Sequence, residues 1–374
     1  MKTWLVALLL LGLTAESFAG EQFKLKFRSR ALLDAMISGY GKENVQGYYK
    51  LEDLRFGFKA TYGKYELRAD LGFGNEKVTV KDLLFNYHFK NSVLSFGNTF
   101  ESFSMDMLIS TAGLRFHQSA ASCMAFTDGR KFGASYHYYT DNCYLSGGVY
   151  TNNDINKLGS DEQKNSFVFT TRAVARKKKR PYTMYHVGGS FSYRTRQVNT
   201  EAPPSVEMSS KGTTSMFSEK LLHARITDAG QEIKGLVEGV YMSPRLLLQS
   251  EYYLERLERT SGEKTYYAHG GYIQGAFLLK GRGFLYDTMY AVPGRPASSQ
   301  AIELVCRFNY TDLNDAHSGI QGGVEKDLSV GGNFYLNRYI GIKINGSYVW
   351  VGKHCNDFYK KNLFLVQMRL QYIF

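Results

Sequence analysis

Basic side chains recur at every second position in several stretches of this sequence. Residues 24–30 read KLKFRSR, in which each even-numbered position is Lys or Arg. Successive side chains of a β-strand point to opposite faces, so such a stretch would gather its cations on one surface. Guanidinium forks bind oxyanions in a bidentate fashion, and clustered cations attract anions. The pattern therefore predicts an anion-binding surface carried by β-strands.

The same alternation, followed along the chain, defines a candidate anion pathway. On the predicted inward faces of the strands, basic residues outnumber acidic ones, and confined cations of this kind favour anions over cations. The candidate residues are Lys26, Arg28, Arg30, Arg55, Lys59, Arg68, Arg115, Arg130, Lys131, Arg307, Lys343 and Arg369. Closure of the sheet would place residues 26–30, 55–59, Arg68 and Arg369 on one wall, as a stack of cations that passes an anion stepwise. In the alternative reading, these cations only pair with acidic residues of the same faces.

Sixteen segments show the period-two pattern of strands that face oil on one side and water on the other. The last is the clearest, because apolar residues occupy every even position from Phe364 to Phe374. The predicted strands span 23–37, 51–61, 64–73, 78–89, 93–99, 131–139, 143–151, 166–176, 184–196, 231–241, 245–257, 265–279, 300–311, 324–336, 338–351 and 363–374. Many such strands with aromatic residues near their ends are typical of transmembrane β-barrels.

The connections between these strands alternate between short and long. Short joints at 63, 90–91, 140–142, 243–244 and 337 would be periplasmic turns, and long segments at 38–50, 100–130, 152–165, 197–230 and 352–362 would be external loops. Two segments on the short side, 176–183 and 280–299, are longer than expected. The first contains RKKKR, interpreted as a solvated turn or as a contact for an anionic periplasmic partner. The fold class predicted is all-β: a 16-stranded antiparallel transmembrane β-barrel.

The first twenty residues differ from the rest. Lys2 precedes an apolar run over 5–13, and Ser17 and Ala19 are small residues placed for cleavage. This is the pattern of a secretory signal peptide, so the expected domains are a signal peptide at 1–20 and a barrel at 21–374. The 374-residue chain has a formal net charge of +12, and its 44% hydrophobic content excludes disorder.

Other architectures and activities fit the sequence less well. A secreted sandwich would need Greek-key connections, and a β-helix or propeller would need internal repeats, which are absent. A lipid hydrolase would need a Ser–His pair on one site, and none is apparent on the predicted lipid faces. Strands that begin at Phe23 leave no room for the plug of an energised receptor. Cys123 and Cys143 could form a disulfide, which spacing alone leaves open, and no metal motif or cofactor motif occurs.

Two stretches carry a specific resemblance. Residues 272–337 contain YIQGAFLLKGRGFLYDTMYAVPGRP, AIELVCRFNYTDLND and GGVEKDLSVGGNFYLNR, and upstream lies FGNTFESFSMDMLISTAGLRF. Their order resembles the phosphate-selective porin O and P family. The resemblance implies a homotrimer of sixteen-stranded porin barrels in a Gram-negative outer membrane, with an inward-folded third loop at about 100–130. It also implies that segments near 197–230 and 280–299 dip into the barrel beside that loop.

The third loop departs from the family pattern. The family places lysines at the constriction, whereas residues 100–129 contain Arg115 and no lysine. This departure weakens the expectation of strong phosphate selectivity and leaves anion conduction unaffected. The predicted function is a passive, anion-selective porin for phosphate or related oxyanions, and the alternative is a general diffusion porin with weak anion preference. The expected partners are phosphate, polyphosphate, chloride and outer-membrane lipid, and nucleic acid is excluded by the compartment.

Overall fold

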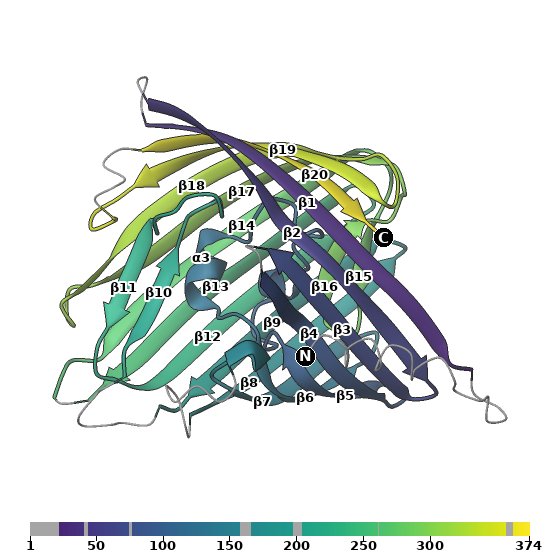
Figure 1. Cartoon of the computed structure of the whole chain (residues 1–374), viewed down its shortest axis with the longest axis horizontal. Helices are drawn as coiled ribbons and strands as arrows, with labels where there is room; N and C mark the ends of the chain where they lie inside the picture. Colours follow the sequence, from purple (N-terminus) through teal and green to yellow (C-terminus); the bar gives the residue numbers. More distant parts are fainter. Residues whose placement is uncertain are drawn as a thin grey trace.

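A computed structural model shows sixteen antiparallel strands that close into a barrel (Figure 1). It describes residues 22–40, 44–74, 77–157, 166–196, 204–260, 262–356 and 362–374, so the predicted signal peptide at 1–20 lies outside the described residues. The barrel strands are β1 (Lys24–Tyr40), β2 (Asn44–Tyr62), β3 (Tyr65–Gly74), β4 (Lys77–His88), β5 (Ser92–Thr99), β6 (Lys131–Tyr139), β7 (Cys143–Thr151), β8 (Phe167–Arg180), β9 (Thr183–Arg194), β12 (Ala229–Met242), β13 (Leu246–Arg259), β14 (Tyr266–Lys280), β17 (Ala301–Asp315), β18 (Ile320–Tyr335), β19 (Ile340–Val351) and β20 (Leu363–Ile373). Every strand predicted from the alternation is present.

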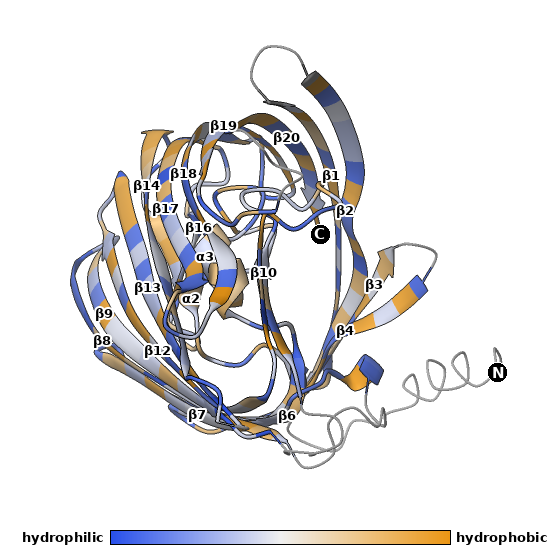
Figure 2. Ribbon diagram, turned by 90° about the vertical axis from the view of Figure 1, so that its left-hand side faces the viewer, coloured by the Kyte–Doolittle hydropathy of each residue, from blue (hydrophilic) through white to orange (hydrophobic). Residues whose placement is uncertain are grey.

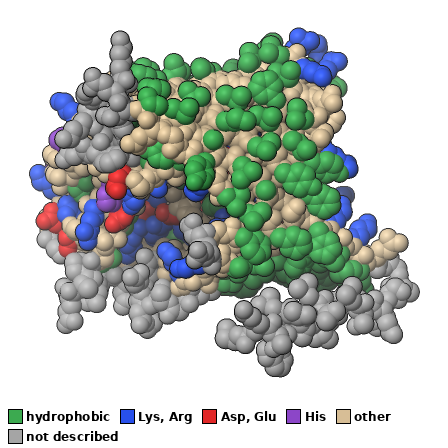
Figure 3. Space-filling view, turned by 45° about the horizontal axis from the view of Figure 1, so that its top comes forward, with side chains coloured by type: hydrophobic (Ala, Val, Ile, Leu, Met, Phe, Trp, Pro, Cys, Tyr) green, Lys and Arg blue, Asp and Glu red, His purple; other side chains and the backbone are tan. Residues whose placement is uncertain are grey.

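Alternation of side chains builds the two faces of the wall. On β20, Met368 and Leu370 are 46% and 42% exposed, while Arg369 between them is fully buried. Hydrophobic side chains cover the part of the barrel wall that Figure 3 shows, as expected for a surface in contact with lipid acyl chains. Among the described residues no helix has the length and apolar character needed to cross a membrane.

Two of the predicted connections are wrong in their extent. The segment 38–50 is not a long external loop, because β1 continues to Tyr40 and β2 begins at Asn44, and the two strands remain paired to their ends. The RKKKR segment is not a turn either. It forms the end of β8, and Lys178 and Arg180 still pair with Met184 and Thr183 of β9. At the end of β8 the pairing extends beyond the last apolar residues, and on β2 it extends over residues 44–50, in which apolar and polar residues do not alternate. The hydropathy pattern registers neither extension.

Three connections carry structure of their own. The segment between β5 and β6, here called the third loop (residues 100–130), contains the short helices α2 (Met105–Leu108) and α3 (Ala121–Phe126). The connection from β9 to β12 holds the hairpin β10 (Val206–Ser210) and β11 (Leu222–Ile226), and that from β14 to β17 holds β15 (Phe284–Asp287) and β16 (Val292–Pro296). A 3₁₀ turn, Ile155–Lys157, follows β7.

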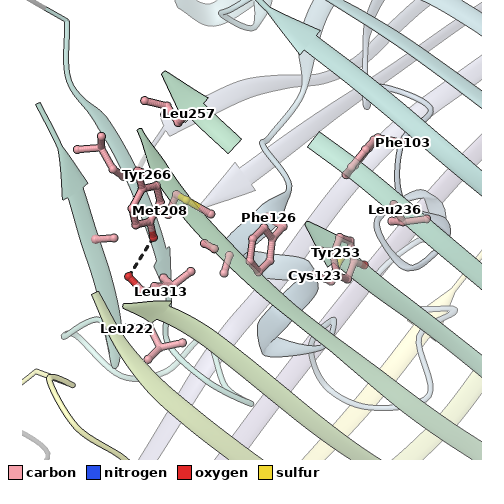
Figure 4. Close-up of a cluster of buried hydrophobic side chains, with 14 of the residues drawn as sticks. Phe103, Cys123, Phe126, Met208, Leu222, Leu236, Tyr253, Leu257, Tyr266 and Leu313 are labelled. Carbon is pink, nitrogen blue, oxygen red and sulfur yellow. Dashed lines mark hydrogen bonds between the residues drawn. The ribbon is translucent and has the colours of Figure 1, made fainter. Parts of the chain in front are cut away.

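The third loop packs against one side of the barrel. Figure 2 shows α2 and α3 near β12 and β13, with β3 and β4 on the opposite side. Phe126 of α3 stacks on Tyr253 of β13, with ring centroids 5.6 Å apart. Leu222 of β11 and Met208 of β10 belong to the same apolar cluster (Figure 4). Burial of these side chains holds the loop and the β10–β11 hairpin to the strands behind them.

Candidate functional site: an arginine-lined cavity

The strands β1, β2 and β3 place cations directly opposite one another. Lys26 faces Lys59 across the β1–β2 pair, and Lys59 in turn faces Arg68 on β3. Four positions further along, Arg30 faces Arg55. Like charges at directly opposed positions destabilise a sheet, so these pairs work against folding. We call this surface the cationic wall, defined by Lys26, Arg28, Arg30, Arg55, Lys59 and Arg68.

Aspartates shared between arginines offset part of this repulsion. Arg30 Nε donates to Asp53 Oδ2 at 2.6 Å, and Arg55 Nε donates to Asp53 Oδ1 at 2.8 Å. One carboxylate thus serves two guanidinium groups that stand opposite each other. The two side chains are 13% and 15% exposed, so each retains some accessible surface.

Two further aspartates link the wall to the start of β6. Asp70 accepts from Arg28 and also lies 3.4 Å from Arg68. Arg68 Nη2 donates to Asp82 Oδ2 at 2.7 Å, and Arg130 Nε donates to Asp82 Oδ1 at 2.6 Å. Each aspartate is shared between two arginines, so the cluster keeps an excess of positive charge.

These arginines open onto a cavity of about 610 Å³. Its charged lining consists of six arginine and three aspartate side chains: Arg28, Arg30, Arg55, Arg68, Arg130, Arg295, Asp70, Asp82 and Asp128. On the other side it is bounded by the third loop, from Met107 to Leu114, and by Met124 of α3. We refer to it as the arginine cavity.

Two of the predicted pathway residues, Lys26 and Lys59, belong to the cationic wall but do not line the cavity. Lys59 pairs with Glu66 at 2.5 Å and is 40% exposed. They lie beside Arg68 in the strand register and extend the row of cations beyond Arg28.

Five other predicted residues are buried, and each donates at least one hydrogen bond to another part of the protein. Arg307 Nη1 donates to the carbonyl of Gln118 at 3.0 Å, and Lys343 Nζ donates to the carbonyl of Leu114. Arg369 forms a bidentate pair with Asp34, with both hydrogen bonds at 2.6 Å. The structure therefore places these three on the wall behind the third loop rather than at the cavity surface, and Arg369 is separated from the cationic wall that it was predicted to join.

Arg115 and Lys131 are also buried, and they too pair with other parts of the protein. Arg115 lies 3.4 Å from Glu303 and donates to the carbonyl of Gly294 at 2.8 Å. Lys131 Nζ donates to Glu101 and Asp128, each at 2.7 Å. Burial alone would raise the pKa of Glu101, but the charges of Lys131 and Arg194 lower it to about 2. Glu101 is therefore ionised and neutralises the one lysine at the end of the loop.

A carboxylate of the wall fastens the beginning of α2. Glu251 on β13 accepts from the backbone N–H groups of Met105 at 2.7 Å and Asp106 at 3.0 Å. Tyr272 donates to the same carboxylate at 2.7 Å. Between α2 and α3, His117 contacts Asn345, and burial together with Arg369 and Lys343 lowers the pKa of His117 to about 3. The imidazole is neutral at physiological pH and adds no charge to the pathway.

Sequence reasoning missed Arg295, which reaches the cavity from the β15–β16 hairpin. The tip of this hairpin is held by Arg172, which donates to the carbonyls of Tyr290 at 2.7 Å and Ala291 at 2.8 Å. Ala291 has a positive φ of 52°, a conformation that costs free energy in a residue other than glycine. The unexplained length of segment 280–299 was the available signal, but its lack of alternation gave no basis for choosing Arg295.

The cysteines play no part in this site. All four are free thiols, so Cys123 and Cys143 are not joined. Cys123 is buried in α3, and burial raises the pKa of its thiol, which stays protonated.

Comparisons with known proteins agree with this architecture. The model of the family described as phosphate-selective porin O and P matches residues 23–374. No curated protein matches the chain in sequence. Among solved structures, OmpT of Vibrio cholerae is 12% identical, with a TM-score of 0.59 and coverage of 96% of this chain and 99% of that one.

Two further structures share the fold at similar distance. An anion-selective porin from Comamonas acidovorans is 8% identical, with a TM-score of 0.59 and coverage of 94% of this chain and 100% of that chain. The outer membrane channel DcaP of Acinetobacter baumannii is 11% identical, with a TM-score of 0.57 and coverage of 96% and 99%. Identities this low indicate a common fold only. The family match, the closed barrel and its lipid-facing exterior establish that the chain is an outer-membrane porin of Gram-negative type, a passive channel rather than an enzyme, and that it belongs to the phosphate-selective porin O and P family.

Proposed function

We propose that this porin forms an anion-selective channel and that phosphate or related oxyanions are its cargo. The observation that carries the proposal is the lining of the arginine cavity, where six arginines face three aspartates. A confined aqueous passage with excess fixed positive charge concentrates anions and repels cations. The anion-selective porin from Comamonas acidovorans, which shares the fold, is consistent with this use of the architecture.

The arrangement of the arginines favours oxyanions over simple halides. A planar guanidinium donates two parallel hydrogen bonds to phosphate or carboxylate, whereas chloride offers no such pair of acceptors. Arg30 and Arg55 stand opposite each other, and Arg28 and Arg68 share Asp70. An oxyanion can therefore exchange one fork for the next without full release. Sharing each aspartate between two arginines keeps every single contact weak enough for the ion to leave.

Between Met107 and Met124, the third loop supplies this site with uncharged groups only; its charged lining residues, Asp128 and Arg130, lie at its end. Arg115 within the loop and Lys131, the first residue of β6, are buried in ion pairs. Any preference for phosphate over chloride must then come from the arginines of the cationic wall, Arg130 and Arg295. The second candidate function, a general diffusion porin with weak anion preference, differs only in the strength of that binding.

Planar bilayer recordings test the proposal. In a KCl gradient we expect a reversal potential on the chloride side, and millimolar phosphate should reduce the chloride current. The double variant Arg30→Gln/Arg55→Gln should weaken both effects. The matched control is Arg256→Gln, because Arg256 is 41% exposed and pairs with Glu258 away from the cavity.

Each outcome has a clear meaning. Anion selectivity without block by phosphate would favour the general diffusion porin. A cation-selective current, or equal effects of the double variant and the control, would contradict the role of the arginine cavity.

We also propose a homotrimer, which the family resemblance implies. The mass of the detergent-solubilised protein, measured by light scattering with correction for bound detergent, tests this. A monomer under mild, lipid-containing conditions would contradict it.

A further inference from the structure

The arginine cavity has two chemically different sides. The cationic wall forms one side, and the third loop contributes Met107, Leu108 and Met124 to the other. Met124 is 40% exposed although it lies on α3 inside the barrel. The hydrophobic residues on the outer wall face membrane lipid, which covers them. Met124 faces the lumen, where no lipid is present. Met107 and Leu108 are half-buried in the same lining, so the three side chains give this side of the cavity an apolar surface that a bound molecule can cover.

An aromatic ring extends this apolar side to the edge of the arginines. Phe100 lines the cavity, and the guanidinium of Arg130 lies 4.3 Å from the centre of its ring. Stacking on the ring orients Arg130 beside an apolar surface while its Nε is held by Asp82. Charge and apolar surface therefore meet at one place in the cavity.

The cavity is also large for a small inorganic ion. Its volume of about 610 Å³ lies within the range of sites for small organic molecules, roughly 300–1,000 Å³, which combine mainly apolar walls with a few oriented polar groups. Phosphate has only five heavy atoms and would leave the third-loop side in contact with water alone.

We infer that the arginine cavity recognises organic oxyanions with an apolar body, such as aryl or alkyl phosphonates and carboxylates. The anionic head binds the arginines, and the apolar body lies against Met107, Leu108 and Met124. Methionine is suited to this role, because its flexible thioether adapts to bodies of different shape. This inference rests on the proposed anion channel and extends it by naming the substrate class.

The test compares probes that share one anionic head. Inorganic phosphate, methylphosphonate and phenylphosphonate are added to the reconstituted channel at a pH where all are dianions, and block of the chloride current is titrated. Covering about half of a phenyl group should lower the blocking concentration about tenfold relative to phosphate. Methylphosphonate should fall between the two.

A variant locates the apolar contact. Met107→Gln/Met124→Gln keeps side-chain length but adds polar groups, and it should reduce the ratio of phosphate to phenylphosphonate blocking concentrations to about threefold or less. Met289→Gln is the matched control, since Met289 lies in the β15–β16 connection and does not line the cavity.

Two results would overturn the inference. One is equal block by phosphate and phenylphosphonate in the unmodified channel, a comparison that needs no variant to fold. The other is an unchanged ratio in the Met107/Met124 variant. If the channel keeps its chloride-side reversal potential in either case, only this inference fails. A cation-selective channel would instead remove the proposed function on which it rests.

Discussion

The two sides of this barrel use the same residue types for different purposes. On the cationic wall, arginines stand opposite one another, share aspartates and remain partly exposed; Arg68, for example, is 28% exposed. On the wall behind the third loop, Arg307, Lys343 and Arg369 are at most 2% exposed and donate to loop carbonyls or to a buried carboxylate. Inward direction is therefore not enough to make a cation part of an ion pathway. What matters is whether another segment of the chain covers the side chain.

The largest effect is expected from a substitution on the wall behind the third loop. Arg369→Gln leaves the buried carboxylate of Asp34 without its cation, and loss of one partner from a buried pair costs about 3–5 kcal/mol. Unfolding in urea, followed by the change in electrophoretic mobility of the folded barrel, should show this loss. Arg256→Gln, on an exposed pair, should change stability by less than about 1 kcal/mol. Similar losses in both variants would contradict the distinction between the walls.

The next effect concerns the attachment of the third loop. Glu251→Ala removes the acceptor for Met105 N, Asp106 N and the Tyr272 hydroxyl, and each donor left without a partner costs about 1–3 kcal/mol. We expect faster hydrogen exchange over residues 101–126 and noisier single-channel currents. Ser250→Ala, the neighbouring residue on the outer face of β13, is the control. Unchanged exchange in the Glu251 variant would show that apolar packing alone holds the loop.

Acid should loosen the same loop through His117. Its pKa is about 3 in the folded protein against an ordinary value of 6.5, so the unfolded segment takes up the proton first. Stability is therefore present above pH 6.5 and is lost as pH falls from there towards 3, by about 1.4 kcal/mol per pH unit at most. Hydrogen exchange of the loop at a series of pH values measures this slope. His117→Gln should flatten it, and a slope that survives the substitution would assign it to other groups.

The smallest effect is expected from a single substitution on the cationic wall. Arg68→Gln should leave the fold nearly unchanged, because Asp70 keeps Arg28 and Asp82 keeps Arg130 as partners. The loss of one charge among several, partly screened by salt, should reduce the chloride-to-potassium permeability ratio by about twofold. Reversal potentials at two salt concentrations provide the measurement. A large loss of stability with unchanged selectivity would place Arg68 with the structural cations.

The barrel itself was accessible from the sequence, because each strand carries its own signal. A residue such as Met368 faces lipid and its neighbour Arg369 faces inward, and this alternation is local. All sixteen strands were predicted for that reason, and errors occurred where pairing continues beyond the apolar residues, as at RKKKR. The inward position of segments 197–230 and 280–299 was predicted only from the family resemblance, since neither segment alternates regularly.

The site was only partly predictable, because exposure of a cation depends on contacts between distant segments. Arg30 and Arg369 look alike in sequence, yet Arg30 lines the cavity, while Arg369 meets Asp34 at a separation of 335 residues. Nothing near Arg307 in the sequence indicates that the carbonyl of Gln118 will accept a hydrogen bond from it. Arg295 could not be selected because its hairpin has no periodic pattern. The pairing of aspartates with the arginines of the cationic wall depends on the register between strands. Hydropathy specifies that register only to within a few residues.

The pairing of the first and last barrel strands has a consequence for the order of assembly. Arg30 to Tyr40 on β1 bond to residues 363–373 on β20, so these contacts join opposite ends of the chain. Such distant contacts form late, because the intervening chain must first be organised. Until β20 arrives, Asp34 has no cation and the β1 edge is open. The ion pair between Asp34 and Arg369 thus marks completion of the ring, and a chain stalled before that step would expose an unpaired strand edge to periplasmic chaperones and proteases.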